Sequence, residues 1–233
     1  MTLAAIESLK QQAGETAAGW AESGMVIGLG TGSTVRHAIA AIGRRLAEGA
    51  LRDVRGVATS LATERQAREL GIPLVDAADL PSIDLCIDGA DEVDPNLDLI
   101  KGLGGALVRE KLVAGSAVRF VVVADAGKRV SALGLRSPLP VAVLPFGWRS
   151  HLPFLAELGA TVALRVGPDG SPQLSDDGLY HLDCHFPRGI DDPELLEMQL
   201  KLRPGVVDSG LFLGLATDAV IADENGVTVL RRP

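Results

Sequence analysis

Short apolar runs alternate with helical patterns through the first 125 residues, and this alternation is the strongest constraint on the fold. Residues 3–22 repeat apolar side chains every three or four positions, which is typical of an amphipathic helix. Strands are expected at 25–29, 54–58, 72–75, 85–87 and 120–124, and further helices at 35–46, 63–70 and 107–114. Strands separated by helices form parallel sheets covered on both faces. We therefore predict an α/β fold with a Rossmann-like parallel sheet covered by helices.

The pattern changes from about residue 130, where Pro138, Pro140, Pro145 and Pro153 come close together. Short strands and helices are expected at 141–144, 151–158, 161–166, 179–185 and 193–201. We predict a Rossmann-like catalytic domain from residues 1–133 and 207–233, and a small α+β domain from residues 134–206 that serves oligomerisation. The apolar segment PGVVDSGLFLGL suggests a self-association surface.

Composition narrows the class of protein. An apolar share of 47% with 22% charged residues is typical of a globular chain. The net charge of -8 argues against nucleic acid or an anionic membrane as the main partner, because both need a basic face. Two cysteines are too few for a disulfide framework, so a reducing cytoplasm is expected. No signal-peptide pattern and no apolar run of roughly 20 residues are seen, so we expect no membrane association.

A glycine-rich loop, GLGTGST at residues 28–34, follows a predicted strand and opens a predicted helix. Free N–H groups and the helix dipole bind phosphate in this setting. A dinucleotide fingerprint would need glycine at position 33, which is Ser33, and an acid after the second strand, where Thr59 and Ser60 stand. The loop also lacks the Gly-Lys-Ser/Thr of a nucleotide P-loop. It therefore predicts a phosphate site, while a capped tight turn is the structural alternative.

Residues 83–111 gather acids, lysines and glycines. Four carboxylates lie within seven positions, at Asp88, Asp91, Glu92 and Asp94. Carboxylates at the ends of parallel strands face the ligand site of an open α/β sheet. A divalent cation is one alternative, although the spacing is not that of an EF-hand. A turn-capping role is the structural alternative for Asp91 or Asp94, and it is favoured for Asp94.

Two further residues of this stretch carry possible chemistry. Lys101 beside Gly102 and Gly104 suits a developing oxyanion. Glu110 by its type alone would most often be a solvated helix residue. Elsewhere, Lys10 and Lys128 could reach a phosphate, although a solvated lysine is the default for each. His181, Cys184 and His185 suggest a metal cluster, but alternation along a strand would turn Cys184 and His185 to opposite faces.

Four motifs in this order, GLGTGST, DGADEVD, KGLGGALVREK and VVVADAGKRV, resemble the type A ribose-5-phosphate isomerases. The resemblance covers most of the chain, including PGVVDSGLF. One departure is Gly-Leu-Gly at 102–104, where the family usually has three glycines. The resemblance implies catalytic roles for Glu110, Asp88, Asp91 and Lys101. It implies substrate contacts for Lys10, Thr31, Gly32, Ser33, Thr34, Asp88, Gly89, Ala90, Asp91, Lys101, Gly102, Leu103, Gly104 and Lys128.

The resemblance also implies an aldose–ketose isomerase that interconverts ribose 5-phosphate and ribulose 5-phosphate through a cis-enediolate, as a homodimer or homotetramer. Glu110 would move the proton between C2 and C1. Neither a metal nor a redox cofactor is expected, and the partner is a small sugar phosphate. Two rival functions stay open, an amino-sugar phosphate deaminase, which would release ammonia, and a non-catalytic sugar-phosphate sensor.

Overall fold

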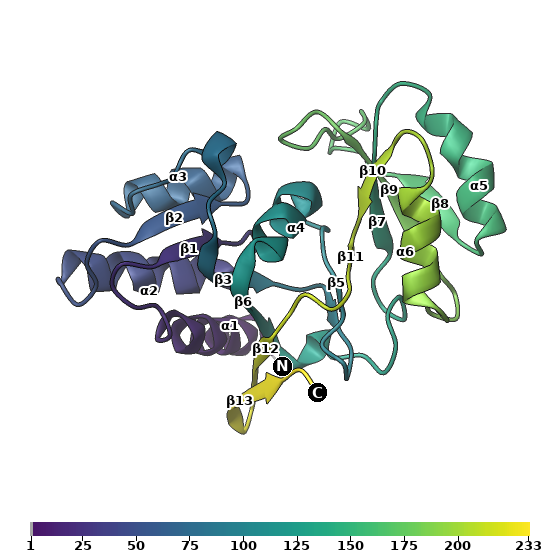
Figure 1. The fold of residues 1–233 in the computed structure, drawn as a ribbon. Helices are drawn as coiled ribbons and strands as arrows, with labels where there is room; N and C mark the ends of the chain where they lie inside the picture. The colour runs from purple at the N-terminus through teal and green to yellow at the C-terminus, as the bar shows by residue number, and fades with distance from the viewer. Residues whose placement is uncertain (1) are drawn as a thin grey trace. The chain divides into compact units, whose positions relative to one another are not determined.

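The computed structural model describes residues 2–233, which fold into two compact units drawn in Figure 1. Unit 1 comprises the residues up to 90 together with 109–129 and 215–233. Unit 2 comprises residues 91–108 and 130–214. The predicted boundaries put residues 91–108 in the larger domain. They lie in unit 2 because β5 (Leu99–Ile100) pairs with β4 (Glu92–Val93) and β11 (Leu211–Phe212).

Unit 1 contains a six-stranded sheet. Its strands run in the order β13 (Gly226–Arg231), β12 (Asp218–Asp223), β6 (Ala117–Asp125), β3 (Ile83–Gly89), β1 (Val26–Leu29) and β2 (Arg55–Ala58). All neighbours are parallel except β12 and β13. The chain tail thus completes the first sheet, and the predicted Rossmann-like architecture is confirmed.

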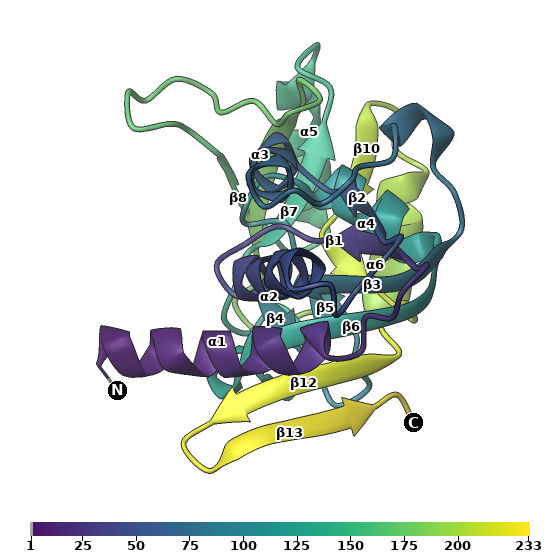
Figure 2. The same cartoon turned by 90° about the vertical axis from the view of Figure 1, so that its left-hand side faces the viewer.

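Helices cover both faces of this sheet. On one face, α1 (Leu3–Ala18) lies beside α2 (Val35–Ala47) and along β12, as Figure 2 shows, and α3 (Leu61–Glu69) packs next to α2. Their buried side chains form one apolar core with alternate residues of β1, β3, β6 and β12. On the other face α4 (Leu107–Gly115) approaches β1, where Val113 lies against Gly28. Short 3₁₀ turns complete the unit at Ala77–Asp79 (η1) and Ala126–Lys128 (η2).

The order in which successive strands join the sheet switches sides between β1 and β3, although these two strands are parallel. From β1 the chain continues to β2 on one side, whereas β3, β6 and β12 follow one another on the other side. Ligands of open α/β sheets bind beyond the carboxyl ends of the strands at such a switch point. The segments that follow β1 and β3 are therefore the first place to look for a site.

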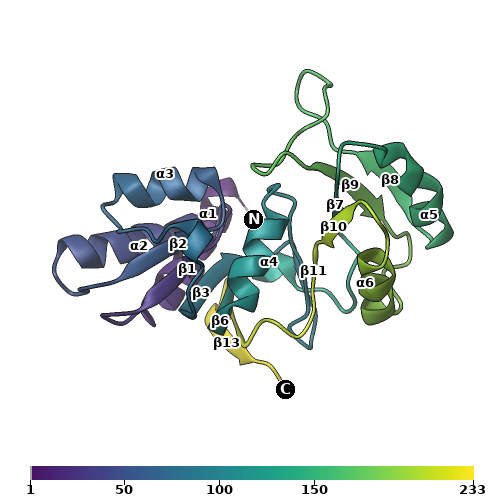
Figure 3. The ribbon, with the colours of Figure 1, turned by 45° about the horizontal axis from the view of Figure 1, so that its top comes forward.

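Unit 2 has the small α+β architecture that the sequence predicts. Its antiparallel sheet has the order β10 (Val206–Ser209), β7 (Leu139–Val143), β9 (Tyr180–His185) and β8 (Thr161–Leu164). Figure 3 shows α5 (His151–Glu157) and α6 (Pro193–Lys201) beside this sheet. The 3₁₀ turn η3 (Trp148–Ser150) leads into α5. The helices share one apolar core with alternate residues of β7 and β9. Pro193 begins α6, as expected from its fixed φ.

Two further sequence-based expectations differ from the structure. Residues 72–75 form only an isolated bridge to β2, between Leu74 and Gly56, instead of a strand. Pro73 has no N–H to continue a ladder, so pairing stops there. In the segment PGVVDSGLFLGL, Leu211 and Phe212 are fully buried inside unit 2. Those two residues therefore contribute to the core of the unit and not to a self-association surface.

The histidines and cysteines of β9 have structural surroundings. Cys184 is buried and His185 is exposed, which confirms the expected alternation. Burial and the nearby charge of Arg165 lower the pKa of His181 to about 4. Across residues 2–233 no group of three or more His, Cys, Asp or Glu side chains is arranged to hold a metal ion. Within the same residues, no helix combines the length and apolarity needed to cross a bilayer.

Candidate functional site

The glycine loop after β1 and the aspartate at the end of β3 meet at the switch point of unit 1. The N–H of Gly30 donates to the carbonyl of Ile87 at 2.9 Å. A Cβ atom added at Gly30 would lie 2.2 Å from Cγ of Asp88. Glycine is thus required here by close approach, and two motifs far apart in the sequence are brought into contact.

Asp88 is fully buried and is held by backbone donors. Its Oδ1 accepts hydrogen bonds from the N–H of Thr31 at 3.0 Å and from the N–H of Gly89 at 2.7 Å. A buried carboxylate needs such partners, because losing its water shell is costly. Asp88 and the glycine loop therefore form one rigid structure.

A cluster of hydroxyl groups anchors the loop from the opposite side. The Oγ1 atom of Thr31 lies 2.8 Å from Thr59 Oγ1, 2.8 Å from Ser60 Oγ and 3.2 Å from Thr63 Oγ1. Thr63 also donates its hydroxyl to the carbonyl of Gly30 at 2.8 Å. The hydroxyl of Thr31 is thus engaged within the protein, and it holds the loop in place.

The sequence alone does not indicate Thr59, Ser60 and Thr63 as contributors to this site. In the sequence, Thr59 and Ser60 only argue against a dinucleotide site. A signal was present, because Ser60 is the N-cap of α3 and accepts from the N–H of Thr63 at 3.1 Å. Hydroxyl residues that follow β2 reach the same edge of a parallel sheet as the loop after β1.

The N-terminus of α2 has the features of an anion site. Thr34 is the N-cap but makes no side-chain capping bond, and the first turn holds no acidic residue. Gly32 has a φ of 134° and, like Ser33, is exposed. Lys10 of α1 donates from Nζ to Ser33 Oγ at 2.9 Å. An ammonium group, a hydroxyl and a helix N-terminus therefore converge at one point, as phosphate binding requires.

Glu110 lies in the first turn of α4 and is only 3% exposed. A solvated helix residue is what its type alone predicts, and that expectation is wrong. The helix connects β3 to β6, so its first turn is near the carboxyl edge of the sheet, where Asp88 also lies. Lys128 lies in the turn after β6, at this same edge, and is half-buried.

Unit 2 holds the other predicted residues in what we call the lysine loop, residues 101–104. Lys101 is buried, and its N–H donates to the carbonyl of Gly210 at 2.9 Å. Its Nζ lies 5.5 Å from the centre of the Phe212 ring. A buried ammonium group is uncommon in proteins and typically has a specific partner or task.

Asp91 is hydrogen-bonded to Leu103 of the lysine loop. The N–H of Leu103 donates to Oδ2 of Asp91 at 3.0 Å. Leu103 is exposed, and its φ is not positive, whereas Gly102 has a φ of 99°. The departure from three glycines thus occurs where the backbone accepts any residue and the side chain extends into solvent.

The remaining acids of the predicted cluster have structural roles. Asp94 accepts from the N–H groups of Asn96 and Asp98, each at 2.8 Å, which is the turn-capping role expected for it. Glu92 is fully buried and accepts from three backbone N–H groups at 2.6 Å. These donors belong to Gly134, Arg136 and Ser137.

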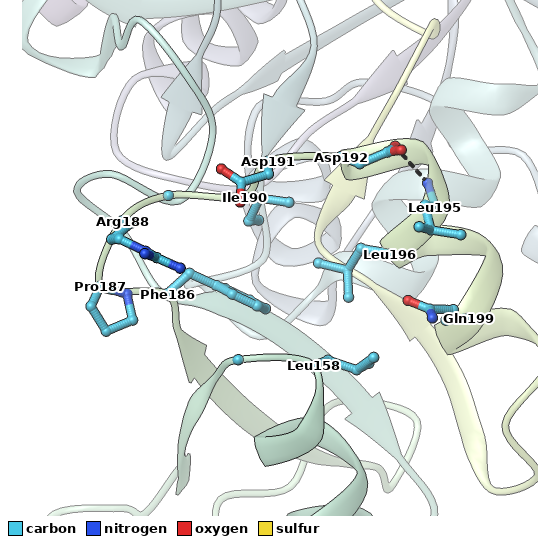
Figure 4. Close-up of a pocket in the computed structure, with 12 residues that line it drawn as sticks. Leu158, Phe186, Pro187, Arg188, Ile190, Asp191, Asp192, Leu195, Leu196 and Gln199 are labelled. Atoms are coloured by element: carbon cyan, nitrogen blue, oxygen red, sulfur yellow. Dashed lines mark hydrogen bonds between the residues drawn. The ribbon is translucent and has the colours of Figure 1, made fainter.

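Each unit also contains a hollow. The one in unit 1 has a volume of about 440 Å³ and lies beside the end of β2, with Arg68 and Arg109 in its lining. The one in unit 2 has a volume of about 230 Å³. Figure 4 shows it between Phe186 and the start of α6, where Asp192 accepts from the N–H of Leu195 at 2.9 Å. None of the predicted site residues lines either hollow.

Comparison with known proteins places these residues in a family. The family model described as ribose 5-phosphate isomerase A (phosphoriboisomerase A) matches residues 55–226. Ribose-5-phosphate isomerase A of Roseiflexus castenholzii is 52% identical over 224 residues, which cover 96% of this chain and 95% of the relative. The corresponding protein of Synechococcus sp. is 48% identical and covers 99% of this chain and 100% of the relative.

Solved structures agree with the sequence relatives. Ribose 5-phosphate isomerase from Plasmodium falciparum superposes with a TM-score of 0.93 at 38% identity and covers 97% of this chain and 98% of that one. A D-ribose-5-phosphate isomerase in complex with phospho-erythronic acid gives a TM-score of 0.94 at 39% identity, with coverage of 97% and 99%. This chain therefore belongs to the type A ribose-5-phosphate isomerase family.

Proposed function

We propose that this chain interconverts D-ribose 5-phosphate and D-ribulose 5-phosphate. The proposal depends chiefly on one observation, the buried carboxylate of Glu110 at the sheet edge that also carries Asp88 and the glycine loop. A carboxylate shielded from water beside a phosphate-binding loop can serve as the general base of an aldose–ketose isomerase that works through an enediolate. The family to which the chain belongs has this activity, and the family name of the relatives supports the same substrate.

The substrate phosphate is assigned to the N-terminus of α2. Its oxygens would accept from the backbone N–H groups of residues 32–34 and from the hydroxyl of Ser33. Lys10, which already donates to Ser33 at 2.9 Å, would neutralise part of the phosphate charge. Lys128 is assigned a second contact, on the basis of the family resemblance.

Glu110 is assigned the proton transfer between carbon atoms. In the open-chain aldose it removes the proton from C2, and the electron pair of that bond forms the cis-enediolate. The same carboxyl group then returns the proton to C1, which gives the ketose. General base catalysis of this kind typically contributes on the order of a hundred- to ten-thousand-fold.

The enediolate oxygen needs donors, and we assign them to Lys101 and to N–H groups of the lysine loop. Loss of one such donor typically costs about 3 to 4 kcal/mol of transition-state stabilisation. Asp88 is assigned proton transfer at oxygen and opening of the sugar ring. Asp91 is assigned an orienting role, which its hydrogen bond to the N–H of Leu103 supports.

We also propose that the protein self-associates through unit 2, as a homodimer or homotetramer, and that it acts in the cytoplasm. Exposed apolar side chains on α6 and at its C-cap support the first proposal. Leu195, Met198 and Leu202 recur at helical spacing, with 45%, 53% and 76% exposure. Cys86 and Cys184 are buried and form no disulfide, which suits a reducing compartment and supports the second proposal.

The test is formation of ribulose 5-phosphate from ribose 5-phosphate, in the presence of a metal chelator. Glu110→Gln keeps the shape of the side chain and removes its basic oxygen, so substrate binding should persist while kcat falls by at least about a hundredfold. Near-normal turnover by that variant would refute the assignment of Glu110. Inactivity of the unaltered protein towards both sugars would refute the proposed function itself.

A further inference from the structure

Arg165, the residue that follows β8, makes a two-pronged ion pair inside unit 2. Its Nε donates to Oδ2 of Asp183 at 3.0 Å, and its Nη2 donates to Oδ1 of the same carboxylate at 2.5 Å. The side chain of Arg165 is only 10% exposed. Because Asp183 lies in β9, the plane of the guanidinium is fixed by the antiparallel sheet.

The third nitrogen of the same guanidinium reaches the lysine loop. Nη1 donates to the carbonyl of Gly102 at 2.9 Å and to the carbonyl of Leu103 at 3.0 Å. These carbonyls belong to the two residues that immediately follow Lys101, and so to two consecutive peptide units. Arg165 therefore connects a rigid strand to the loop that carries the proposed oxyanion donors.

Holding these two carbonyls also sets where the following N–H groups point. The N–H and C=O of a trans peptide unit point in opposite directions. In the unit between Gly102 and Leu103, the carbonyl faces Arg165 and the N–H donates to Asp91. The next unit has its carbonyl on the same guanidinium, so the N–H of Gly104 is directed away from Arg165.

Gly104 is exposed, and among residues 2–233 its N–H makes no hydrogen bond within the chain. A backbone donor that is fixed in direction and open to a ligand is what an oxyanion site requires. Lys101 alone could supply charge, but a second, directed donor would need a rigid backbone.

We propose that Arg165, held by Asp183, is a positioning residue that fixes the lysine loop and orients the N–H of Gly104 towards the enediolate oxygen. This inference rests on the proposed isomerase function. It explains why the loop tolerates leucine at position 103, since its shape depends on its carbonyl groups and not on a bare backbone there.

The test compares Arg165→Lys and Arg165→Ala with the unaltered enzyme in steady-state kinetics in both directions. Lysine keeps the charge, but its three N–H donors spread from a single nitrogen and cannot reproduce the four bonds that the planar guanidinium makes to Asp183 and the two carbonyls. A loop displaced by about 1 Å can cost about a hundredfold in rate. We expect kcat to fall by about ten- to a hundredfold in both variants, while KM changes by less than about threefold. Guanidinium ion at low concentration should restore part of the kcat of Arg165→Ala.

The matched control is Arg119→Lys in unit 1. Arg119 makes the same two-pronged pair with Asp218, at 2.9 and 3.0 Å, but contacts no predicted site residue through it. This control should lower the melting temperature and leave kcat within about twofold.

Three outcomes would overturn the inference. The first is an unchanged kcat in Arg165→Lys. The second is a loss of kcat in Arg119→Lys as large as the loss in Arg165→Lys. The third is a folded Arg165→Ala variant whose kcat is not raised by guanidinium ion. If Arg165→Ala does not fold, Asp183→Asn replaces it, with the same expected fall in kcat. If the unaltered enzyme is active and the Arg165 variants keep its kcat, only the role of Arg165 is refuted. If the unaltered enzyme is inactive, the proposed function itself is refuted.

Discussion

Replacing Gly30 by alanine should damage both stability and turnover, because the added methyl group has no room. Its Cβ would lie 2.2 Å from Cγ and Oδ1 of Asp88 and 2.6 Å from Cα of the same residue. Ordinary contacts of a Cβ atom begin at 3.4 Å, so the ends of β1 and β3 must separate by about 1 Å. Since one clashing atom belongs to the backbone, a side-chain rotation cannot relieve the contact.

The size of the effect follows from the bonds that such a separation breaks. Gly30 loses its 2.9 Å bond to the carbonyl of Ile87, and Thr31 loses its 3.0 Å bond to Asp88. Overpacking costs about 1 to 3 kcal/mol, and each lost hydrogen bond adds about 0.5 to 1.5 kcal/mol. We expect the free energy of unfolding to fall by about 2 to 6 kcal/mol. In the folded fraction, kcat should fall by about a hundredfold.

Urea unfolding followed by tryptophan fluorescence gives the stability, and ribulose 5-phosphate formation gives the turnover. Gly115→Ala is the matched control, because Gly115 lies in α4, has no positive φ and has open space where a Cβ would point. Its stability should stay within about 1 kcal/mol of the unaltered protein. If Gly30→Ala matches this control in both stability and kcat, the close-approach argument is refuted.

Three further predictions follow from the site and its surroundings. Lys10→Met removes the ammonium beside Ser33, so KM should rise about tenfold while kcat stays within about threefold; an unchanged KM would contradict the phosphate assignment. Thr63→Val should lower kcat more than Thr63→Ser, because only serine can still donate to Gly30; equal activities would contradict anchoring by the hydroxyl cluster. Burial lowers the pKa of His181 from 6.5 to about 4. Between pH 4 and 6.5 its imidazole is therefore protonated in the unfolded chain and neutral in the folded one. Stability in urea should therefore fall as the pH drops from 6.5 to 4, and a His181→Asn variant with equal pH dependence would contradict this.

The fold could be predicted from the sequence because it follows from local patterns. Short apolar runs indicate the strands, and apolar residues that recur every three or four positions indicate the helices. The alternation of strands and helices along the chain implies a parallel sheet. The helix at 193–201 was predicted with its observed ends, since Pro193 marks its start. The strand at 72–75 was not correct, because pairing depends on a neighbour and Pro73 limits the number of bonds.

The motifs of the site could likewise be recognised by residue type and spacing. Each motif is one continuous stretch of the chain: the glycines at 28–34, the acids after residue 87, and the lysine loop. Their order along the chain identified the family. The assignment of phosphate binding to the first loop needed only the strand–loop–helix pattern. The sequence by itself therefore determined the class of fold, the family and most of the candidate residues.

Tertiary structure decided which side chains support those motifs. Thr31 is held by a hydroxyl cluster that follows β2, and Leu103 is held by Arg165, 62 positions further along the chain. No local pattern marks such partners, because contact between distant segments arises only when the sheets assemble. Glu110 gives the clearest case. Its type predicts a solvated residue, and only the packing of α4 at the edge of the sheet makes it a buried carboxylate.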